Sequence, residues 1–323
     1  MTVPQTRRDF IKRTAQAGAI AAAATAVGLW RRDEAGPAAS HSAKSESYPD
    51  FSHADRKLIS IVRGGDRAKS VCKAIELLGG MDKFIQPGDR VLIKVNAAFA
   101  MPAALGATTH PEMLAAVIML CHEAGAKSVR VSDNPINDPA SCFRLTGIEQ
   151  ACAENGAQLV LPSAGAFRPV TVEGATLIRD WPALWTPFDG VTKVIGLAPV
   201  KDHHRAGASL SMKNWYGLTG GRRNIFHQHI HTFIPELARM MRPTLVVLDG
   251  TTAMMTNGPT GGSLSDLKAT NTVIASTDQV AADAFALTLL GRNISDVPYI
   301  ANAAAAGLGT VDYESLKPRR GDA

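Results

Sequence analysis

The sequence predicts an α/β fold with a mainly parallel, mixed sheet and flanking helices. Short runs of β-branched and other apolar residues alternate with longer segments of helical periodicity from residue 57 onward. Glycine and proline stand at most junctions between them, where turns are needed. The chain has 323 residues, of which 46% are hydrophobic and 20% charged, an ordinary globular composition. We therefore expect one large α/β domain over residues 57–323.

The elements follow in a regular order. Apolar runs predict strands over residues 58–63, 90–96, 128–132, 159–161, 191–200, 244–248 and 272–276. Helical spacing predicts helices over residues 67–78, 110–124, 143–154, 233–241, 279–290 and 298–306. Residues 168–181 alternate around Glu173-Gly174, which predicts a peripheral hairpin. No repeat of fixed period is present.

The N-terminus has the pattern of a targeting signal. Arg7-Arg8 precede an alanine-rich apolar run over residues 17–30. A bilayer core needs about 20 strongly apolar residues, so we expect a twin-arginine signal peptide over residues 1–39 and no stable membrane span. An exposed amphipathic helix is the alternative. Residues 40–56 are polar and predict a flexible linker.

The twin-arginine signal predicts export, to a periplasmic or equivalent location, with the translocation machinery as a partner. That route carries folded proteins, and many of its cargoes load a cofactor first. The net charge of +5 is scattered and aromatics are only 6%, so we expect no nucleic-acid partner. Of the four cysteines, none are at two-residue spacing, so no iron–sulfur cluster is expected. A disulfide between Cys142 and Cys152 is left open.

Polar residues stand at the ends of several predicted strands. Asp133 and Asp249 each follow an apolar strand, and Lys201 and His203 follow another. In an open parallel sheet, ligands bind outside the carboxyl ends of the strands. Asp133 is a candidate metal ligand and Asp249 a candidate general base. The alternative for both carboxylates is a turn or helix cap.

Histidines are concentrated in the middle of the chain. His227, His229 and His231 are spaced by two and would share one face of a strand; we expect the segment to be extended or a loop. Three such imidazoles suit a divalent transition metal. In the alternative, one histidine binds a ligand and the others are solvated or cap a helix. His203 and His204 are adjacent, so at most one is expected to face a crevice.

Basic and small residues in the same stretch predict an anion site. Lys213 and Asn214 suit a carboxylate or phosphate, and Lys213 is also a catalytic candidate, as is His227. Lys201, His203, Arg222 and the loop around Gly261 are further candidates for binding the ligand or cofactor. No P-loop and no Rossmann glycine pattern is present. Asp283, in an apolar helix, needs a partner such as Lys213 or a metal.

These motifs as a set resemble the domain of unknown function 362 family. The matching residues are 93–96, 110–112, 123–126, 199–201, 203–204, 211–214, Gly217, His227, 241–243, Asp249, 257–259, 261–262, 275–278, Asp283 and 307–309. The resemblance implies a soluble α/β protein, often with a twin-arginine leader and from redox or metal contexts. Some relatives carry a ferredoxin-like module, which the cysteine spacing here does not support. Val95 stands where proline is common.

The sequence thus predicts an exported α/β protein of unknown reaction with a metal or metal-containing cofactor beside an anionic ligand; a metal-dependent or redox enzyme is one reading, and whether it is an enzyme is left open. The alternative is a non-catalytic binding or accessory protein for an anion, a metal or a redox complex.

Overall fold

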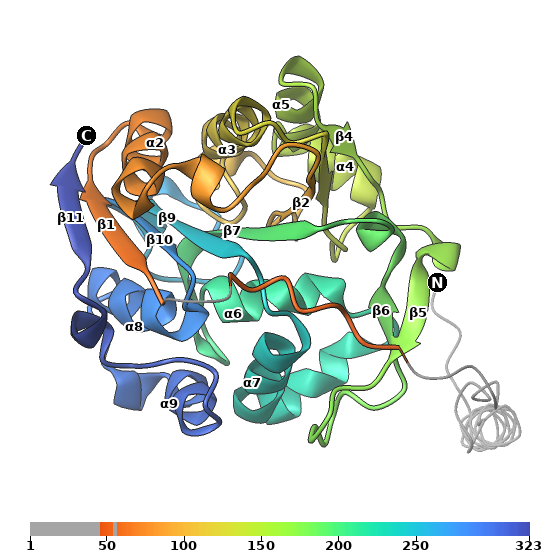
Figure 1. Ribbon diagram of the computed structural model, residues 1–323. Coiled ribbons are helices and arrows are strands. Elements are labelled where there is room, and N and C mark those ends of the chain that lie inside the picture. The colour runs from red at the N-terminus through yellow and green to blue at the C-terminus, as the bar shows by residue number, and fades with distance from the viewer. Residues whose placement is uncertain (1–45, 54–56) are drawn as a thin grey trace, which may run out of the picture. The chain divides into compact units, whose positions relative to one another are not determined.

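A computed structural model describes residues 46–53 and 57–323. Within these residues, nine strands form one sheet in the order β11-β1-β10-β9-β7-β2-β3-β4, with β8 paired to β7 (Figure 1). The strands are β1 (Ile59–Arg63), β2 (Arg90–Lys94), β3 (Ser128–Ser132), β4 (Gln158–Leu159), β7 (Lys193–His203), β8 (Gly207–Ser209), β9 (Leu245–Met254), β10 (Leu267–Ser276) and β11 (Arg319–Asp322). The predicted signal peptide, residues 1–39, lies outside the described residues.

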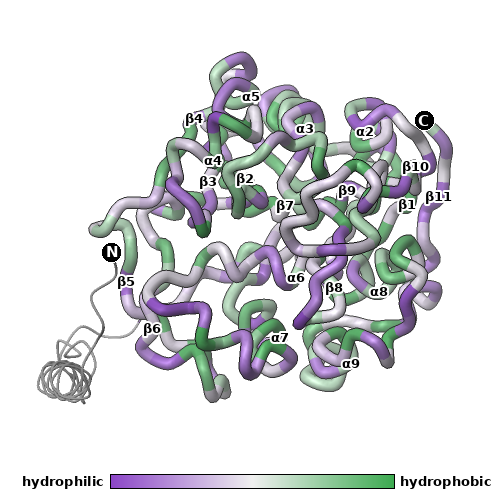
Figure 2. Tube along the Cα trace, turned by 180° about the vertical axis from the view of Figure 1, so that it is seen from behind, coloured by the Kyte–Doolittle hydropathy of each residue, from purple (hydrophilic) through white to green (hydrophobic). Residues whose placement is uncertain are grey.

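The predicted mixed, mainly parallel sheet is confirmed. Strands β9, β7, β2, β3 and β4 pair in parallel, and β10 pairs antiparallel with both β9 and β1. The carboxyl ends of β2, β3 and β7 therefore meet at one edge of the sheet. The outer strand β11 is exposed and hydrophilic, as the purple tube in Figure 2 shows.

Helices cover both faces of the sheet (Figure 1). On one face lie α2 (Arg67–Leu78), α3 (Pro111–Glu123), α4 (Pro139–Leu145) and α5 (Ile148–Glu154), and on the other lie α6 (Ser211–Asn214), α7 (Ile230–Met240), α8 (Gln279–Leu289) and α9 (Pro298–Ala305). Short 3-10 helices span Met81–Lys83, Ala103–Leu105, Ala164–Ala166, Thr186–Phe188, Trp215–Leu218, Arg223–His229, Leu264–Asp266, Ile294–Asp296 and Tyr313–Leu316.

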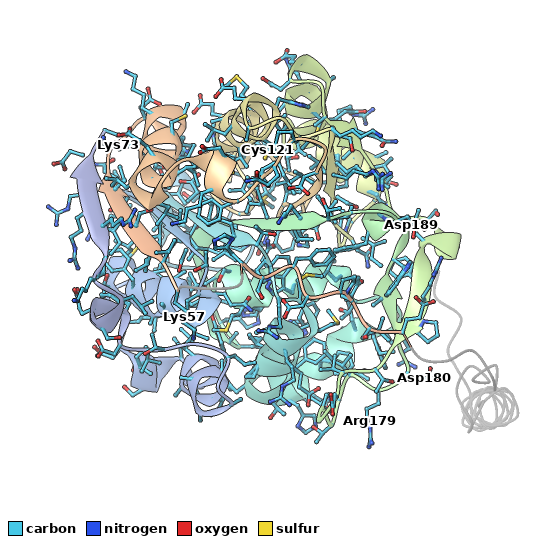
Figure 3. The ribbon with its side chains drawn as sticks, in the orientation of Figure 1. Lys57, Lys73, Cys121, Arg179, Asp180 and Asp189 are labelled. Atoms are coloured by element: carbon cyan, nitrogen blue, oxygen red, sulfur yellow. The ribbon has the colours of Figure 1, made fainter. Side chains whose placement is uncertain are left out.

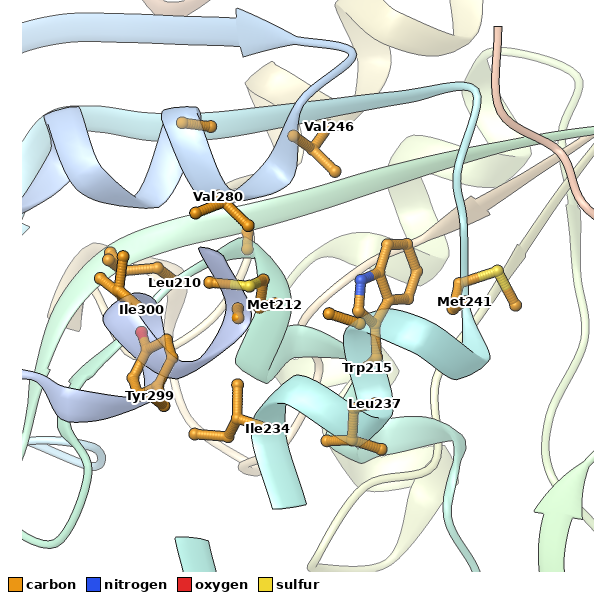
Figure 4. Close-up of a cluster of buried hydrophobic side chains, with 14 of the residues drawn as sticks. Leu210, Met212, Trp215, Ile234, Leu237, Met241, Val246, Val280, Tyr299 and Ile300 are labelled. Atoms are coloured by element: carbon orange, nitrogen blue, oxygen red, sulfur yellow. The ribbon is translucent and has the colours of Figure 1, made fainter. Parts of the chain in front are cut away.

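Each face of the sheet has its own apolar core, because strand side chains alternate between faces. Val246 and Leu248 of β9 belong to one core, and Leu245 and Val247 belong to the other. In the core that contains the side chains of α6, the Trp215 ring lies near Leu237 of α7, Met241 and Val246 of β9 (Figure 4). Gly196 of β7 leaves room for that ring, since a Cβ there would lie 2.7 Å from it. The same packing fixes the position of α6.

The predicted helix ends agree best with the structure where a capping residue marks them. The side chain of Asp66 accepts the Lys69 N–H at the start of α2, and Gly79 ends that helix at φ 112°. The predicted helix over residues 143–154 is instead two helices. Gly147, at φ 77°, separates α4 from α5, because a residue in the left-handed region cannot continue a right-handed helix.

The hairpin prediction is confirmed, with strands farther from the turn than expected. Strand β5 (Phe167–Val170) pairs antiparallel with β6 (Trp181–Leu184) in a separate two-stranded sheet. The loop between them carries Arg179 and Asp180, whose side chains point away from the domain in Figure 3. The Glu236 carboxylate of α7 accepts three backbone N–H groups of this loop and holds it in place.

The prediction of a flexible linker over residues 40–56 is wrong for residues 46–53. Tyr48 and Phe51 are buried, because their rings pack with Phe188 at centroid distances of 4.6 Å and 6.3 Å. The Phe51 N–H also donates to the Arg242 carbonyl over 3.0 Å. Two aromatic rings can bury enough apolar surface to fix a short polar segment. The remainder of that linker lies outside the described residues.

No helix in the part of the chain that the structure describes is long and apolar enough to cross a membrane.

Candidate functional site

A cavity of about 90 Å³ opens where β2, β3 and β7 end, beneath α6. Its volume is that of about three water molecules, so it suits a small ligand. Four basic residues line it: Lys94, Lys201, Lys213 and Arg223. Asp133 is the carboxylate among its described lining residues. Basic groups thus outnumber acidic groups in the described wall of the cavity.

A larger hollow of about 440 Å³ lies near the start of the domain and is also basic. Its cations already have partners, since Lys57 lies 3.0 Å from Asp278 and Arg242 lies 2.7 Å from Asp50. The smaller cavity is therefore the stronger candidate for a charged ligand.

Lys94 and Asp133 form a buried ion pair at the base of the cavity. Lys94 Nζ lies 2.8 Å from Asp133 Oδ1, and the two side chains are 1% and 2% exposed. Lys94 Nζ also donates to the carbonyls of Val95 and Asn214 and to Asn214 Oδ1. Burial lowers the pKa of Lys94, and the Asp133 carboxylate opposes that shift. Every proton of this ammonium has an acceptor within the protein.

Asp133 and Asn214 are likewise committed to the protein. Asp133 accepts the backbone N–H groups of Ala97 and Asn134 over 2.7 Å and 2.8 Å. Asn214 donates to the carbonyls of Lys94 and Leu197. These contacts tie the ends of β2, β3 and β7 to α6. We therefore assign Asp133 and Asn214 a positioning role.

Gly217 makes this close packing possible. A Cβ at this position would overlap the Asp133 carboxylate and lie 2.8 Å from Lys94 Nζ. The Gly217 carbonyl accepts the Asn134 N–H over 3.1 Å. Glycine is thus required because the backbone itself closes over the ion pair.

Among the four basic residues that line the cavity, Lys213 has no hydrogen-bond or ion-pair partner in the described chain. It is 9% exposed, and no hydrogen bond or ion pair joins its Nζ to any residue that the structure describes. Its Nζ lies 5.1 Å from the centre of the Tyr216 ring. Burial and the charges of Arg223 and Lys94 lower the pKa of Lys213 to about 7. A buried charge of this kind needs a compensating ligand or must lose its proton.

Lys201 is a second basic group with incomplete compensation. Its Nζ donates to the carbonyl of Ala107 and lies 5.4 Å from the centre of the Phe99 ring. Within the described chain it has no carboxylate partner. Burial and the charge of Lys213 lower the pKa of Lys201 to about 7. Two lysines of lowered pKa thus lie on one cavity.

Asp283 positions α6 rather than pairing with Lys213. Its carboxylate accepts the N–H groups of Ser211 and Met212 and the Ser211 hydroxyl, over 2.5–3.1 Å. Because α6 is a single turn, this cap fixes where Lys213 lies. Burial raises the pKa of Asp283 to about 7 in spite of these hydrogen bonds.

His203 is held as a neutral hydrogen-bond donor. The N–H groups of Arg205 and Ala206 both donate to its Nδ1 over 3.2 Å, so the ring proton lies on Nε2. Burial and the charges of Lys213 and Lys201 strongly lower the pKa of His203. The adjacent His204 is exposed, so one of the pair faces the cavity, as expected.

His227 has the opposite tautomer. The Tyr216 hydroxyl donates to the Arg223 carbonyl over 2.5 Å, so His227 Nδ1, 3.1 Å from that hydroxyl, is a donor. Nδ1 also lies 3.2 Å from the Asn224 carbonyl. The lone pair is therefore on Nε2. Burial and the charge of Lys213 lower the pKa of His227, which keeps the ring neutral near pH 7.

Arg223 closes the cavity from the side. Its guanidinium donates to the carbonyls of Tyr216, Thr219, Asn134 and Pro135 over 2.8–3.3 Å. These bonds join the segment after α6 to the loop after β3. An open groove of about 440 Å³ leads outward from the cavity and shares Tyr216, Arg223 and His227 with it.

The structure brings most of the predicted site residues together and separates the others. Asp133, Lys201, His203, Lys213, Asn214 and His227 line the cavity. Asp249 does not; it pairs with Arg67 over 3.0 Å and accepts the Thr251 hydroxyl over 2.6 Å. Arg222 is exposed, and Arg223 takes the place predicted for it. Gly261 packs on Met254 outside the cavity wall.

The expected extended segment over His227, His229 and His231 is instead helical. A 3-10 helix covers Arg223–His229 and α7 follows from Ile230, so the three rings do not share one face. His229 is exposed, and His231 lies 6.4 Å from the ring of Tyr299. Among the described residues, no group of three or more His, Cys, Asp or Glu side chains is placed to hold a metal ion. Metal binding stays a prediction.

Sequence reasoning gave too little weight to Lys94, Tyr216 and Arg223. In the sequence, Lys94 is only the polar end of a predicted strand. Its partner Asp133 is 39 residues away in the chain, so no local pattern indicates the ion pair. Tyr216 follows the Lys213-Asn214 motif after one intervening residue, and this proximity was the available signal. The four cysteines are free thiols, including Cys142 and Cys152.

Comparison with known proteins assigns the family. The model of the family described as Domain of unknown function (DUF362) matches residues 91–288, which include every lining residue discussed above. The chain belongs to this DUF362 family. The resemblance drawn from the sequence motifs is thereby confirmed.

Two similar proteins are worth noting. The Thylakoid-associated protein sll1697 from Synechocystis sp. is 28% identical over 280 residues, covering 81% of this chain and 83% of that protein. The structure of the lactate racemase apoprotein from Thermoanaerobacterium thermosaccharolyticum aligns with a TM-score of 0.40 at 11% identity. That alignment covers 78% of this chain and 60% of the other.

Proposed function

We propose that this DUF362 protein binds a small anionic molecule in the cavity formed by Lys94, Lys201, Lys213 and Arg223. The observation that carries the proposal is the buried Lys213 ammonium, which has no acceptor among the described residues. Lys201 adds a second charge without a carboxylate partner. A carboxylate or phosphate oxygen between the two lysines would compensate both.

The two histidines indicate which hydrogen-bonding groups the proposed ligand should carry. His203 offers an Nε2–H donor and His227 offers an Nε2 lone pair, and both rings line the cavity. A ligand that carries an oxyanion at one end and a hydroxyl, amine or carbonyl at the other would use both. Such a site also suits proton transfer, which favours an enzyme over a carrier protein.

A metal or metal-containing cofactor beside the anion is a second candidate. The expected twin-arginine signal at Arg7-Arg8 and the free Nε2 of His227 support it, because neutral imidazole is a metal ligand. Metal content, measured on protein purified from its export route, tests this candidate. Alanine at His227 should remove the metal, while alanine at His229 should leave it. Equal metal content in both variants would contradict it.

Calorimetric titration with formate, acetate, propionate and phosphate near neutral pH tests anion binding. A charged hydrogen bond contributes about 1.5–3 kcal/mol, so Lys213→Met should weaken binding by about 10- to 150-fold. Lys193→Met is the matched control, because Lys193 begins strand β7 at the end remote from the cavity. Equal affinity in wild type and Lys213→Met, with both folded, would refute the proposal. Binding by wild type without turnover would favour the carrier.

A further inference from the structure

We propose that Lys213 forms an imine with the carbonyl carbon of a small 2-oxo acid whose carboxylate is held by Lys201. This inference rests on the proposed function, since it assumes that the cavity takes a small anion. It adds a covalent step and a substrate class. The groups that carry it are the three cavity lysines, which differ in what their amines contact.

Only one of these three lysines has an uncommitted amine. Lys94 Nζ has four acceptors at 2.7–3.0 Å, including the Asp133 carboxylate. Lys201 Nζ donates to the Ala107 carbonyl, which fixes its direction. Lys213 Nζ has no such bond to any described residue and borders the open cavity. Its nitrogen can therefore approach a carbonyl carbon without breaking a contact within the protein.

The surroundings of Lys213 favour the nucleophilic amine. Burial and the charges of Arg223 and Lys94 lower its pKa to about 7, so a large fraction is unprotonated at neutral pH. Nearby cations and desolvation are the usual means by which a protein activates a lysine toward carbonyl compounds. The α6 cap by Asp283 holds the residue in place, since Ser211 and Met212 both donate to that carboxylate.

The remaining cavity groups fit the other atoms of a 2-oxo acid. Lys201 supplies a positive charge for the carboxylate, and the Nε2–H of His203 can donate to one of its oxygens. His227 keeps its Nε2 lone pair because Nδ1 donates to Tyr216 and Asn224. The cavity of about 90 Å³ limits the ligand to a few carbons, although its mouth opens into the groove beside Tyr216.

The step balances without any redox partner. The unprotonated Lys213 nitrogen attacks the carbonyl carbon and forms a C–N bond, while His227 Nε2 carries one proton from that nitrogen to the carbonyl oxygen, which becomes a hydroxyl. The hydroxyl then takes one proton from solvent and leaves as water as the C–O bond breaks. The product is a protonated imine, so its positive charge lies beside the carboxylate of the same molecule. Water can reverse the reaction.

Reductive trapping tests this inference. The full chain is incubated with pyruvate and sodium cyanoborohydride, and the labelled residue is located by peptide mass spectrometry. We expect one carboxyethyl group per chain on Lys213, and none in Lys213→Arg, which keeps the charge but cannot form an imine. Excess propionate, a carboxylate without a reactive carbonyl, should suppress the label. Lys193→Arg, far from the cavity, should be labelled on Lys213 as the wild type is.

The outcomes separate this inference from the proposed function. Absence of label on Lys213 while propionate binds by calorimetry would overturn the imine and leave anion binding intact. Label on Lys201 or spread over surface lysines, without suppression by propionate, would also overturn it. If neither pyruvate nor any of the titrated anions binds, the proposed function itself fails. The position of the label in the wild-type protein tests the imine even if Lys213→Arg does not fold.

Discussion

Replacing Lys94 by methionine should destabilise the domain strongly, because it leaves a buried carboxylate without its cation. Asp133 is 2% exposed and would keep only the N–H groups of Ala97 and Asn134. Removing one partner of a buried pair costs about 3–5 kcal/mol. For a domain of this size that corresponds to a decrease in Tm of about 10 °C. Methionine has a similar length, so lost packing contributes little.

Thermal unfolding followed by circular dichroism measures this effect, with Lys73→Met as the matched control. Lys73 lies 2.9 Å from Glu76 on the outer side of α2, where both side chains are exposed (Figure 3). A surface pair contributes about 0–1 kcal/mol, so this control should shift Tm by no more than about 2 °C. The double variant Lys94→Met with Asp133→Asn should recover part of the loss. Equal shifts in Lys94→Met and Lys73→Met would refute the reasoning.

Other predictions concern close packing, pH and export. Gly217→Ala should lower Tm by several degrees, because its Cβ would overlap the buried carboxylate, whereas Gly165→Ala, with open space around it, should not. As pH rises from about 7 to 10, wild type should gain stability relative to Lys213→Met. The pKa of Lys213 is about 7 in the folded protein, below the ordinary value of 10.5, so the unfolded chain binds more protons in this range. Denaturant titrations at several pH values measure this difference in the free energy of unfolding. The buried thiols contribute equally in both proteins and cancel. A difference that stays constant with pH would contradict the prediction. Lysine at both Arg7 and Arg8 should retain the protein in the cytoplasm in cell fractionation, and unchanged export would refute the twin-arginine prediction.

The order and type of the elements could be predicted because each depends on local periodicity and caps. The limits of α2 follow from Asp66 and Gly79, both visible in the sequence. The single turn of α6 could not be predicted in this way. It contains four residues and exists because Asp283, 72 residues from Ser211, caps it. Tertiary contacts of this kind leave no local pattern.

The sequence could predict which stretch of the chain contains the candidate site, but not which side chains contact each other there. Strand ends and small basic motifs identified Lys201, His203 and Lys213, because parallel strands bring their carboxyl ends together. The sequence could not show that Asp249 pairs with Arg67, 182 residues away. Nor could it show that the segment containing His229 is helical, since the histidine spacing of two residues is the spacing of one face of a strand.

Proton uptake on anion binding tests the central claim most directly. Lys201 and Lys213 both have a pKa of about 7, so at about pH 8 roughly nine-tenths of each amine is unprotonated in the empty site. An anion bound between them should restore the charge, because it favours the protonated form. Titrating propionate, or phosphate if it binds more tightly, at about pH 8 in buffers of different ionisation enthalpy should show uptake of about one proton or more. Uptake should fall toward zero near pH 6. Binding without proton uptake at the higher pH would contradict the account.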